Sequence, residues 1–409
     1  MSQGGPAAPG GAGHDHPGRL RDAWILDETV TFLNHGSFGA CPAVVLDAQA
    51  RLRAELEREP IVFLVRGLES RLDAARERLA AFIGADADDV AFVTNATMGV
   101  NAVLRWLPLA PGDELLTTDH AYNACRNQLD AVASRAGARV VVAKIPFPIR
   151  GPDDVLAPIL AAAGPRTKLV LLDHITSPTA LVFPVERIVA ALAERGIDTI
   201  VDGAHAPGMV DLDISRIGAA YYTGNCHKWL CAPKGAAFLH VRRDRQTGIR
   251  PLSISHGANS PRTDRSRFRL EFDWSGTDDP TAFLCVADAI AFLGGLLPGG
   301  WAGLRAAIHT AAIDAQRVLA EALGVPLPAP ASMLGSMTSL PLPPADPAAA
   351  AGPSRFARAI DPLQASLFER HRIEVPVFAS PVGRVIRAAM PVYATPADVA
   401  TLARALTTS

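Results

Sequence analysis

The sequence predicts an α/β fold, in which a mostly parallel, doubly wound sheet forms a large domain and a smaller α+β domain follows it. Three observations lead to this prediction. Continuous apolar segments of strand length alternate with amphipathic helices, as in a parallel sheet covered on both faces. This alternation stops near residue 270, and different elements follow. The chain has 409 residues, more than one hydrophobic core usually supports.

The individual elements follow from the spacing of apolar residues. We expect strands at 89–95, 113–119, 138–145, 167–175 and 198–204, with helices between them at 98–107, 123–138, 152–164 and 184–196. Earlier helices are expected at 44–59 and 69–85, the second ended by Gly84. Later elements are helices at 281–296 and 302–323, a long loop at 336–356, and strands at 373–380 and 383–393. Thr395 is predicted to cap a closing helix at 395–406.

These elements suggest four segments along the chain. Residues 1–19 are rich in glycine and proline and are expected to form a disordered tail. Residues 20–60 are expected to pack with the small domain, 61–280 to form the large domain, and 281–409 the small one. The tail lacks the basic and apolar regions of a secretory signal. Its His14-Asp15-His16 triplet has nothing around it to fix ligand geometry, so we expect no metal site.

Charge and cysteine content narrow the class of protein. The chain has 39 basic and 41 acidic residues and a formal net charge of −2, which gives no reason to expect nucleic acid or an anionic membrane as partner. No apolar run reaches the roughly 18 to 20 residues of a membrane helix. The cysteines lack CxxC spacing, which is typical of reduced thiols in the cytoplasm. A GxSxG hydrolase motif and a GxGxxG dinucleotide motif after the first strand are both absent.

The segment from Asp202 to Lys228 has the residue types of a cofactor site. Asp202 ends an apolar strand, where doubly wound sheets place groups that bind ligands. Lys228 follows another strand between His227 and Trp229, which is an unusual place for a solvated lysine. Lysine occurs only at 144, 168, 228 and 234, so few residues could supply a reactive amine. A buried lysine near cations loses its proton easily and can then react with an aldehyde. If a cofactor with a pyridine ring lies between the two residues, the buried carboxylate of Asp202 would stabilise the protonated nitrogen of that ring.

Seven motifs in one order extend this pattern. They are FLNHGSFG at 32–39, TNATMGVN at 94–101, DHAYNA at 119–124, DHITSPTALVFPVE at 173–186, VDGAHAPG at 201–208, HKWLCAPKG at 227–235 and SGTDD at 275–279, with a weaker match, RVIRAAMPVY, at 384–393. With them the sequence resembles the class V aminotransferase family, and within it the isopenicillin N epimerase-like branch. The resemblance implies a fold-type I transferase that uses pyridoxal 5′-phosphate (PLP).

The resemblance assigns catalytic roles to three residues. Lys228 is expected to hold PLP through a Schiff base, and Asp202 is expected to pair with the nitrogen of the pyridine ring. His205 is expected to touch the ring or its phenolic oxygen. Ser177 falls where the family contacts that same oxygen, and Tyr122 where an aromatic ring stacks on the pyridine. We prefer Tyr122 to His120 for the stacking position.

Other matched positions surround the phosphate and the substrate. The phosphate-side residues are expected to be Ala96, Thr97, Asn225, His227, Gly276 and Thr277. In the family the last two come from the neighbouring subunit, which implies a homodimer with shared active sites. For an amino-acid substrate, Arg387 matches the arginine that binds the α-carboxylate, with Arg384 as a close rival. The remaining candidates for contact with the substrate are Asn34, His35, Gly36 and Arg66.

The reaction remains open within the PLP-dependent enzymes. We favour lyase chemistry, β-elimination or C–S cleavage on a cysteine or cysteine S-conjugate, because relatives in this branch catalyse such reactions. Alternatives are epimerisation of an isopenicillin N type, decarboxylation-coupled oxidative deamination, transamination, and a non-enzymatic PLP-fold protein. Relatives act in bacterial antibiotic pathways, lincosamide pathways among them, and the composition rich in arginine and alanine fits such a source.

Two features depart from the cysteine desulfurases of this family. Those enzymes carry a catalytic cysteine shortly before the arginine that binds carboxylate, whereas this chain has FASPVGRVIR at 378–387. Persulfide transfer by that route is therefore not expected. Cys226 beside Lys228 and Cys41 near the NHGSFG motif have no assigned role, and we expect buried, inert thiols.

Overall fold

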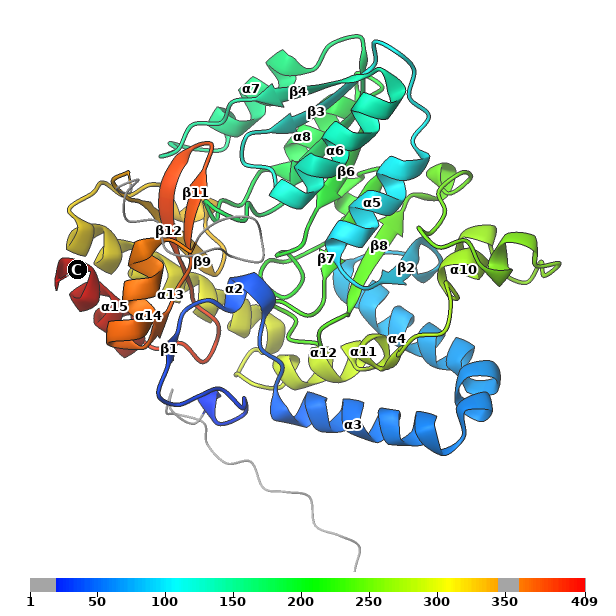
Figure 1. Ribbon diagram of the computed structural model, residues 1–409, viewed down its shortest axis with the longest axis horizontal. Helices are drawn as coiled ribbons and strands as arrows, with labels where there is room; N and C mark the ends of the chain where they lie inside the picture. Colours follow the sequence, from blue (N-terminus) through cyan, green and yellow to red (C-terminus); the bar gives the residue numbers. More distant parts are fainter. Residues whose placement is uncertain (1–19, 345–359, 409) are drawn as a thin grey trace, which may run out of the picture.

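The computed structural model describes residues 20–344 and 360–408. A seven-stranded sheet forms the centre of the larger part of the molecule (Figure 1). Its strands in spatial order are β2 (Val90–Val93), β8 (Ala237–Val241), β7 (Tyr221–Asn225), β6 (Asp198–Asp202), β5 (Thr167–Asp173), β3 (Glu114–Thr118) and β4 (Arg139–Ala143). The expected strands of the α/β series are therefore present, and the fold class is confirmed.

The direction of one strand differs from a fully parallel arrangement. β8 runs antiparallel to both of its neighbours, β2 and β7, whereas β7, β6, β5, β3 and β4 are mutually parallel. Residues 226–236 join β7 to β8 and contain no helix. A parallel connection usually crosses back over the sheet through a helix, so a link without one favours the opposite direction.

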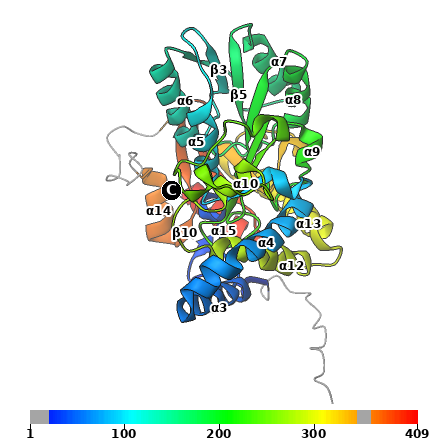
Figure 2. The same ribbon diagram turned by 90° about the vertical axis from the view of Figure 1, so that its right-hand side faces the viewer.

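Helices cover both faces of this sheet. Figure 2 shows α5 (Ala96–Trp106) and α6 (Asn123–Ala136) on one side, and α7 (Asp153–Ala162) and α8 (Val185–Ala193) on the other. Neighbouring residues of β6 point to opposite faces, and Ile200 and Val201 accordingly belong to different apolar clusters. An apolar core therefore packs on each face of the sheet, and polar side chains lie at the carboxyl ends of the parallel strands.

A three-stranded antiparallel sheet forms the centre of the smaller part. Its order is β11 (Val377–Ser380), β12 (Gly383–Ala389) and β9 (Met337–Pro341). The surrounding helices are α13 (Gly300–Leu323), α14 (Pro362–His371) and α15 (Pro396–Thr408). The loop predicted for 336–356 is wrong at its start, where β9 forms, because the prolines only come at the end of that strand and after it. Residues 345–359 of that segment lie outside the described residues.

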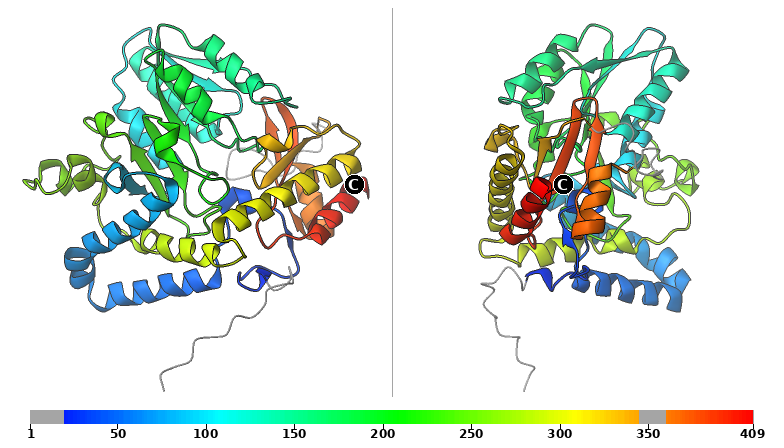
Figure 3. Two further views of the ribbon diagram at one scale, coloured as in Figure 1. Left: turned by 180° about the vertical axis from the view of Figure 1, so that it is seen from behind. Right: turned by 60° about the vertical axis from the view of Figure 1, so that its left-hand side comes forward.

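The N-terminal segment spans both parts of the molecule. β1 (Thr31–Phe32) pairs in parallel with β10 (Ile373–Glu374) of the smaller part, and α2 (His35–Phe38) lies between the two sheets (Figure 1). α3 (Ala43–Arg58) then runs along the base, joined through the π-helix η1 (Val62–Gly67) to α4 (Leu68–Ile83), as Figure 3 shows from behind. α3 packs against α11 (Thr281–Leu284) and α12 (Val286–Gly294).

Helix ends follow the expected local rules. Gly84 ends α4 in the left-handed conformation, with φ of 63°. Thr395 and Asp398 form a reciprocal capping box at the start of α15, because each side chain accepts the backbone N–H of the other. The single helix predicted at 281–296 is interrupted at Cys285, between α11 and α12. Among residues 20–344 and 360–408, none of the helices has the length and apolar character that a bilayer span requires.

Candidate active site

The carboxyl ends of two neighbouring strands place two acidic side chains together. Asp173 ends β5 and Asp202 ends β6, and the two residues are direct partners in the parallel register. Both are buried, with 3% and 4% of their surfaces exposed. Burial raises the pKa of Asp202, and burial together with the negative charge of Asp202 raises the pKa of Asp173 well above its usual range. Hydrogen bonds from Cys125 and Ala204 and the charge of Lys228 oppose this rise at Asp202, so a proton shared by the two carboxyls is favoured on Asp173.

Two hydrogen bonds hold the Asp202 carboxylate in place at the carboxyl end of its strand. Its Oδ2 accepts a hydrogen bond from the Cys125 thiol of α6 at 3.2 Å, and its Oδ1 accepts the backbone N–H of Ala204 at 3.0 Å. Asp173 Oδ1 accepts the backbone N–H of Tyr122 at 3.3 Å and so ties down the start of α6. Sequence analysis missed Asp173 and Cys125. Asp173 could have been found by the signal that found Asp202, an aspartate at the end of an apolar strand.

Lys228 lies in the turn that follows β7. The backbone of this turn is fixed by bonds between Cys226 and Ala236 and between Cys231 and Lys228. The Lys228 amine lies 3.3 Å from Nε2 of His205. Burial, together with the positive charge of Arg387, lowers the pKa of Lys228 to about 8. About a tenth of this amine is therefore neutral and nucleophilic at pH 7, far more than for a lysine with the usual pKa of about 10.4.

α2 supports this turn from the other part of the molecule. His35 is fully buried, with Nε2 3.0 Å from the carbonyl oxygen of Lys228 and Nδ1 2.8 Å from the Tyr393 hydroxyl. A side chain at Gly39 would collide with the His227 carbonyl, since an added Cβ would lie 2.1 Å from it. His35 uses both ring nitrogens to hold the chain, so it supports Lys228 from behind and has no free nitrogen for the substrate contact that we predicted.

Arg387 of β12 points toward the same region and lacks an acidic partner. Its guanidinium donates to the Ser177 carbonyl at 2.6 Å, to Ser177 Oγ at 3.3 Å and to Ser37 Oγ at 3.1 Å. Arg387 is 1% exposed, and burial lowers its pKa to about 10, so it remains charged at neutral pH. In the described part of the chain no carboxylate pairs with it, and its Nε has no hydrogen-bond partner.

The rival arginine is engaged elsewhere. Arg384 lies three residues earlier on β12, which places it on the opposite face of the strand. It forms two hydrogen bonds to Asp361, at 2.6 and 2.8 Å. The geometry therefore favours Arg387 as the residue that is free to receive a carboxylate.

The NHGSFG motif shapes the surroundings of Arg387. A Cβ added to Gly36 would lie 3.3 Å from the Arg387 guanidinium, so glycine leaves room for that side chain. Ser37 accepts from Arg387 and donates to Asn34, whose amide donates to Glu374 at 2.8 Å. Asn34 thus holds Ser37 in place beside Arg387, and its contact with the substrate stays a prediction.

Residues predicted on the phosphate side come together at the start of α5. Asn225 ends β7, and its Oδ1 accepts the backbone N–H of Ala96 at 2.8 Å. Thr97 lies in the first turn of the same helix. His227 Nδ1 lies 2.9 Å from the Ala236 carbonyl, and burial, followed by the charge of Lys228, lowers the pKa of His227 to about 4. The helix N-terminus and the Asn225 side-chain amide offer donors for an anion, whereas the single N–H of neutral His227 already faces the Ala236 carbonyl.

The aromatic candidates divide clearly. His120 is buried and both of its ring nitrogens are occupied, by Thr179 Oγ1 at 2.7 Å and by the Ile145 carbonyl at 3.1 Å. Tyr122 is the N-cap of α6 and is 44% exposed, and partial burial, followed by the nearby groups Cys125 and Asp202, raises its pKa. Tyr122 is thus the accessible aromatic ring of the two, whereas His120 belongs to the core.

The remaining predicted residues are Arg66, Gly276 and Thr277. Arg66 is exposed on η1, at the edge of the molecule remote from α2 (Figures 1 and 3). Gly276 has a φ of 138° and lines a surface pocket with Thr94 and Met98 near the start of α5. Thr277 beside it is exposed.

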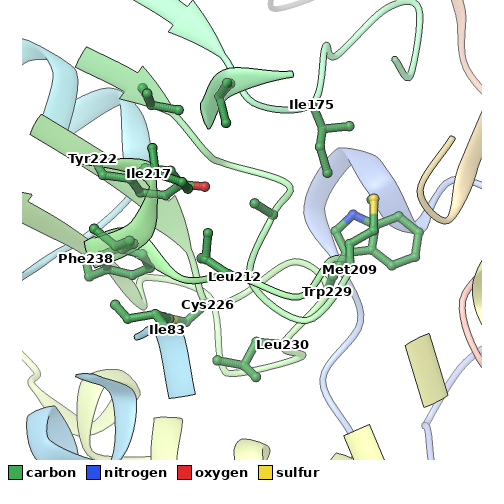
Figure 4. Packing of buried hydrophobic residues seen from close by; sticks show 14 of the residues in the cluster. Ile83, Ile175, Met209, Leu212, Ile217, Tyr222, Cys226, Trp229, Leu230 and Phe238 are labelled. Atoms are coloured by element: carbon green, nitrogen blue, oxygen red, sulfur yellow. The ribbon is translucent and has the colours of Figure 1, made fainter. Parts of the chain in front are cut away.

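The cysteines show no sign of reactivity. All five are unpaired and buried. Burial raises the pKa of Cys41 to about 12 and raises that of Cys226 as well. Figure 4 shows Cys226 inside an apolar cluster with Ile83, Leu230 and Phe238. Such thiols stay protonated at neutral pH, as expected for packing residues. The His14-Asp15-His16 triplet lies outside the described residues.

Comparison with known families agrees with this geometry. The family model "Aminotransferase class-V" matches residues 53–355. The chain belongs to the class V aminotransferase family. It is 37% identical over 400 residues to isopenicillin N epimerase from Amycolatopsis lactamdurans, an alignment covering 94% of this chain and 96% of that one. It is 35% identical over 333 residues to putative L-cysteine desulfhydrase 1 from Oryza sativa subsp. japonica, covering 77% and 67%.

A solved structure gives the same class V fold. A mutant of C-DES with glycine covalently linked to the PLP cofactor superposes with a TM-score of 0.77 at 22% identity, covering 95% of this chain and 98% of that one. Class V aminotransferases are PLP-dependent enzymes, and this chain is one of them.

The residues of this chain fit PLP. The cofactor carries an aldehyde, a pyridine nitrogen and a phosphate, and when bound it withdraws electrons from Cα of an amino-acid substrate. Lys228 offers a buried amine of lowered pKa, Asp202 a buried acceptor, and the start of α5 a set of donors. Arg387, a buried cation without an acidic partner in residues 20–344 and 360–408, leaves one charge for the substrate to neutralise.

Replacing Asp202 by asparagine should separate turnover from folding. We expect turnover to fall by about 100-fold or more, because the negative charge beside the ring nitrogen is lost. The cofactor should remain attached to Lys228. The melting temperature should not fall, because the change removes one of two adjacent buried carboxyls. Steady-state rates, absorbance and calorimetry measure these three quantities, and unchanged turnover would contradict the role.

The lowered pKa of Lys228 predicts how cofactor capture depends on pH. Only the neutral amine attacks an aldehyde, so the rate should rise with pH and level off above about 8. An ordinary lysine would level off above its usual pKa of about 10.4. Stopped-flow absorbance of the cofactor-free protein mixed with PLP measures this rate. A rate still rising at pH 10 would contradict the lowered pKa.

Proposed function

We propose that this protein is a PLP-dependent lyase that cleaves the C–S bond of a cysteine or a cysteine S-conjugate. The observation that carries the proposal is the pairing of one mobile base, Lys228, with one free carboxylate receptor, Arg387. Arg387 holds the α-carboxylate by a bidentate contact. Lys228 then takes the proton from Cα, and the electron pair expels the sulfur from Cβ as a thiolate.

The surrounding groups favour elimination because it needs one base. The imidazoles of His205 and His35 have pKa values held far below neutrality by burial, and both rings are held by other residues. Neither side chain is a mobile acid for the second face of the substrate. Two relatives from Oryza sativa subsp. japonica named putative L-cysteine desulfhydrase 1 and 2, at 35% and 34% identity, support the same reaction class.

Epimerisation at Cα is the second candidate. It is favoured by the 37% identity to isopenicillin N epimerase over 94% of this chain. An epimerase must deliver a proton to the face of Cα opposite Lys228. Tyr122, which is 44% exposed, is the candidate for this acid. A tyrosine whose pKa is raised stays protonated at neutral pH and could donate.

One incubation separates the candidates. The purified protein is mixed in deuterated buffer with L-cysteine, S-alkyl cysteines and larger thiol conjugates, and thiol, pyruvate, CO₂ and Cα stereochemistry are measured. Equal amounts of thiol and pyruvate are expected. Inverted Cα without thiol would establish an epimerase, and CO₂ with loss of the amine would establish decarboxylation-coupled oxidative deamination. A keto acid formed with the sulfur retained would establish transamination.

The assembly and setting are parts of the same proposal. We propose a cytoplasmic homodimer with shared active sites, in which Gly276, Thr277 and Arg66 of one subunit reach the site of the other. The exposure of Thr277 and Arg66, and of Ile61, Val62 and Val65 next to Arg66 in the chain, supports a contact surface. The proposal includes the division of the chain into a segment 20–60 that packs with the small domain, a large domain 61–280 and a small domain 281–409. It also includes a place in bacterial specialised metabolism, such as antibiotic biosynthesis.

A further inference from the structure

His205 lies between two hydrogen-bonding groups of the same turn. Its Nδ1 lies 3.3 Å from the indole nitrogen of Trp229, and its Nε2 lies 3.3 Å from the Lys228 amine. His205 is 2% exposed and Trp229 is 4% exposed. The imidazole of His35 packs on the indole, with ring centroids 4.9 Å apart. The indole is therefore fixed in place, and Figure 4 shows it at the edge of the apolar cluster.

The chemistry of indole determines which nitrogen of His205 carries the proton. An indole N–H can only donate, so the atom facing it must be an acceptor. Burial, together with the charges of Lys228 and Arg387, holds the pKa of His205 well below its usual value, so the ring is neutral. A neutral imidazole has one N–H and one acceptor. With Nδ1 accepting from Trp229, the proton resides on Nε2.

This tautomer directs an N–H at the Lys228 amine. A protonated amine has three N–H groups and no lone pair, so it cannot accept from His205, whereas a neutral amine can. The other charged or titratable groups that act on the amine come from three elements: Arg387 on β12, Asp202 on β6 and Cys125 on α6. Arg387 opposes the ammonium form and Asp202 favours it, while burial keeps the Cys125 thiol protonated and uncharged.

We propose that Trp229 is a positioning residue whose indole N–H fixes the Nε2–H tautomer of His205, so that His205 presents a donor and not an acceptor to Lys228. The arrangement disfavours the ammonium form of Lys228 and so favours the neutral amine that attacks an aldehyde. Its second consequence, a fixed donor toward the cofactor, rests on the proposed function. A phenylalanine or leucine at 229 could fill the same apolar space but could not select the tautomer.

The direct test replaces only the N–H group. Benzothienylalanine introduced at position 229 keeps the bicyclic shape of tryptophan and has sulfur in place of N–H. Nitrogen-15 spectra of the imidazole rings are recorded on the full-length protein, and the His205 signals are identified by their loss in His205→Gln. We expect a single Nε2–H tautomer in the natural protein and a mixture in the substituted one. An Nδ1–H tautomer in the natural protein, or an unchanged tautomer after substitution, would overturn the proposal.

A second measurement reports on the lysine. When His205 is free to offer an acceptor, a protonated Lys228 gains a hydrogen bond, and the pH at which cofactor capture levels off should move up by about one unit. Trp229→Phe should give the same shift, with the benzothienyl protein controlling for lost volume. An unchanged pH profile in both would overturn the proposal. Failure of the protein to bind PLP would instead sink the proposed function and leave the tautomer measurement intact.

Discussion

Lys228→Ala should lose all covalently attached cofactor and reduce turnover by more than about 1,000-fold, because the variant lacks both the attachment point and the base that moves the Cα proton. The Lys228 amine lies 3.3 Å from Nε2 of His205, and its pKa is lowered to about 8. No other lysine of the chain combines these two properties. Absorbance after gel filtration measures attachment, and thiol release from a cysteine conjugate measures turnover.

Lys168→Ala is the matched control. Lys168 is an exposed residue of β5 that pairs with Asp113 at 3.7 Å, far from the strand ends that form the site. The control should retain colour and activity. If the Lys228 variant kept a cofactor that borohydride fixes to the protein, the amine would have been assigned to the wrong residue.

Arg387→Ala should lower kcat/KM by about 100- to 1,000-fold, mainly through KM, because a buried charge pair with the substrate carboxylate is lost. The guanidinium is held by Ser177 and Ser37 and has one nitrogen without a partner. Arg387→Lys should recover only part of the loss, because a lysine cannot form the bidentate contact. An amine substrate without a carboxylate should show little difference between the natural protein and these variants.

Arg384→Ala is the control on the same strand. Arg384 points to the other face and pairs with Asp361, so its loss should leave KM near the natural value and affect stability instead. Should the Arg384 variant raise KM while the Arg387 variant does not, the two arginines would have to exchange roles. Circular dichroism and cofactor content confirm that both variants are folded.

The main sheet was predictable because each strand is a continuous apolar run bounded by amphipathic helices. The direction of β8 was also within reach, since the residues between Asn225 and Ala237 include no helix of the kind that usually makes a parallel crossover. β9 was hidden by the prolines that follow Leu340. Its pairing with β12 depends on residues about 45 positions away, and apolar spacing along one segment does not show such a partner.

The site was predictable where a single motif carries both chemistry and position. Asp202, His205 and Lys228 were identified in this way, and the structure brings them to one edge of the sheet. The choice between Arg384 and Arg387 needed the fold, because a strand pattern shows that they face opposite ways but not which face meets the site. The contact between Trp229 and His205 joins two turns, so only the folded chain reveals it.

Mass spectrometry after borohydride reduction tests the central assignment most directly. The purified protein is treated with borohydride in the presence of PLP, digested, and searched for a pyridoxyl group on peptides that contain lysine. The structure predicts the modification on Lys228 and an unmodified Lys234, whose amine already donates to the Gly39 carbonyl at 2.9 Å. A pyridoxyl group on Lys234, or on no lysine, would contradict the assignment.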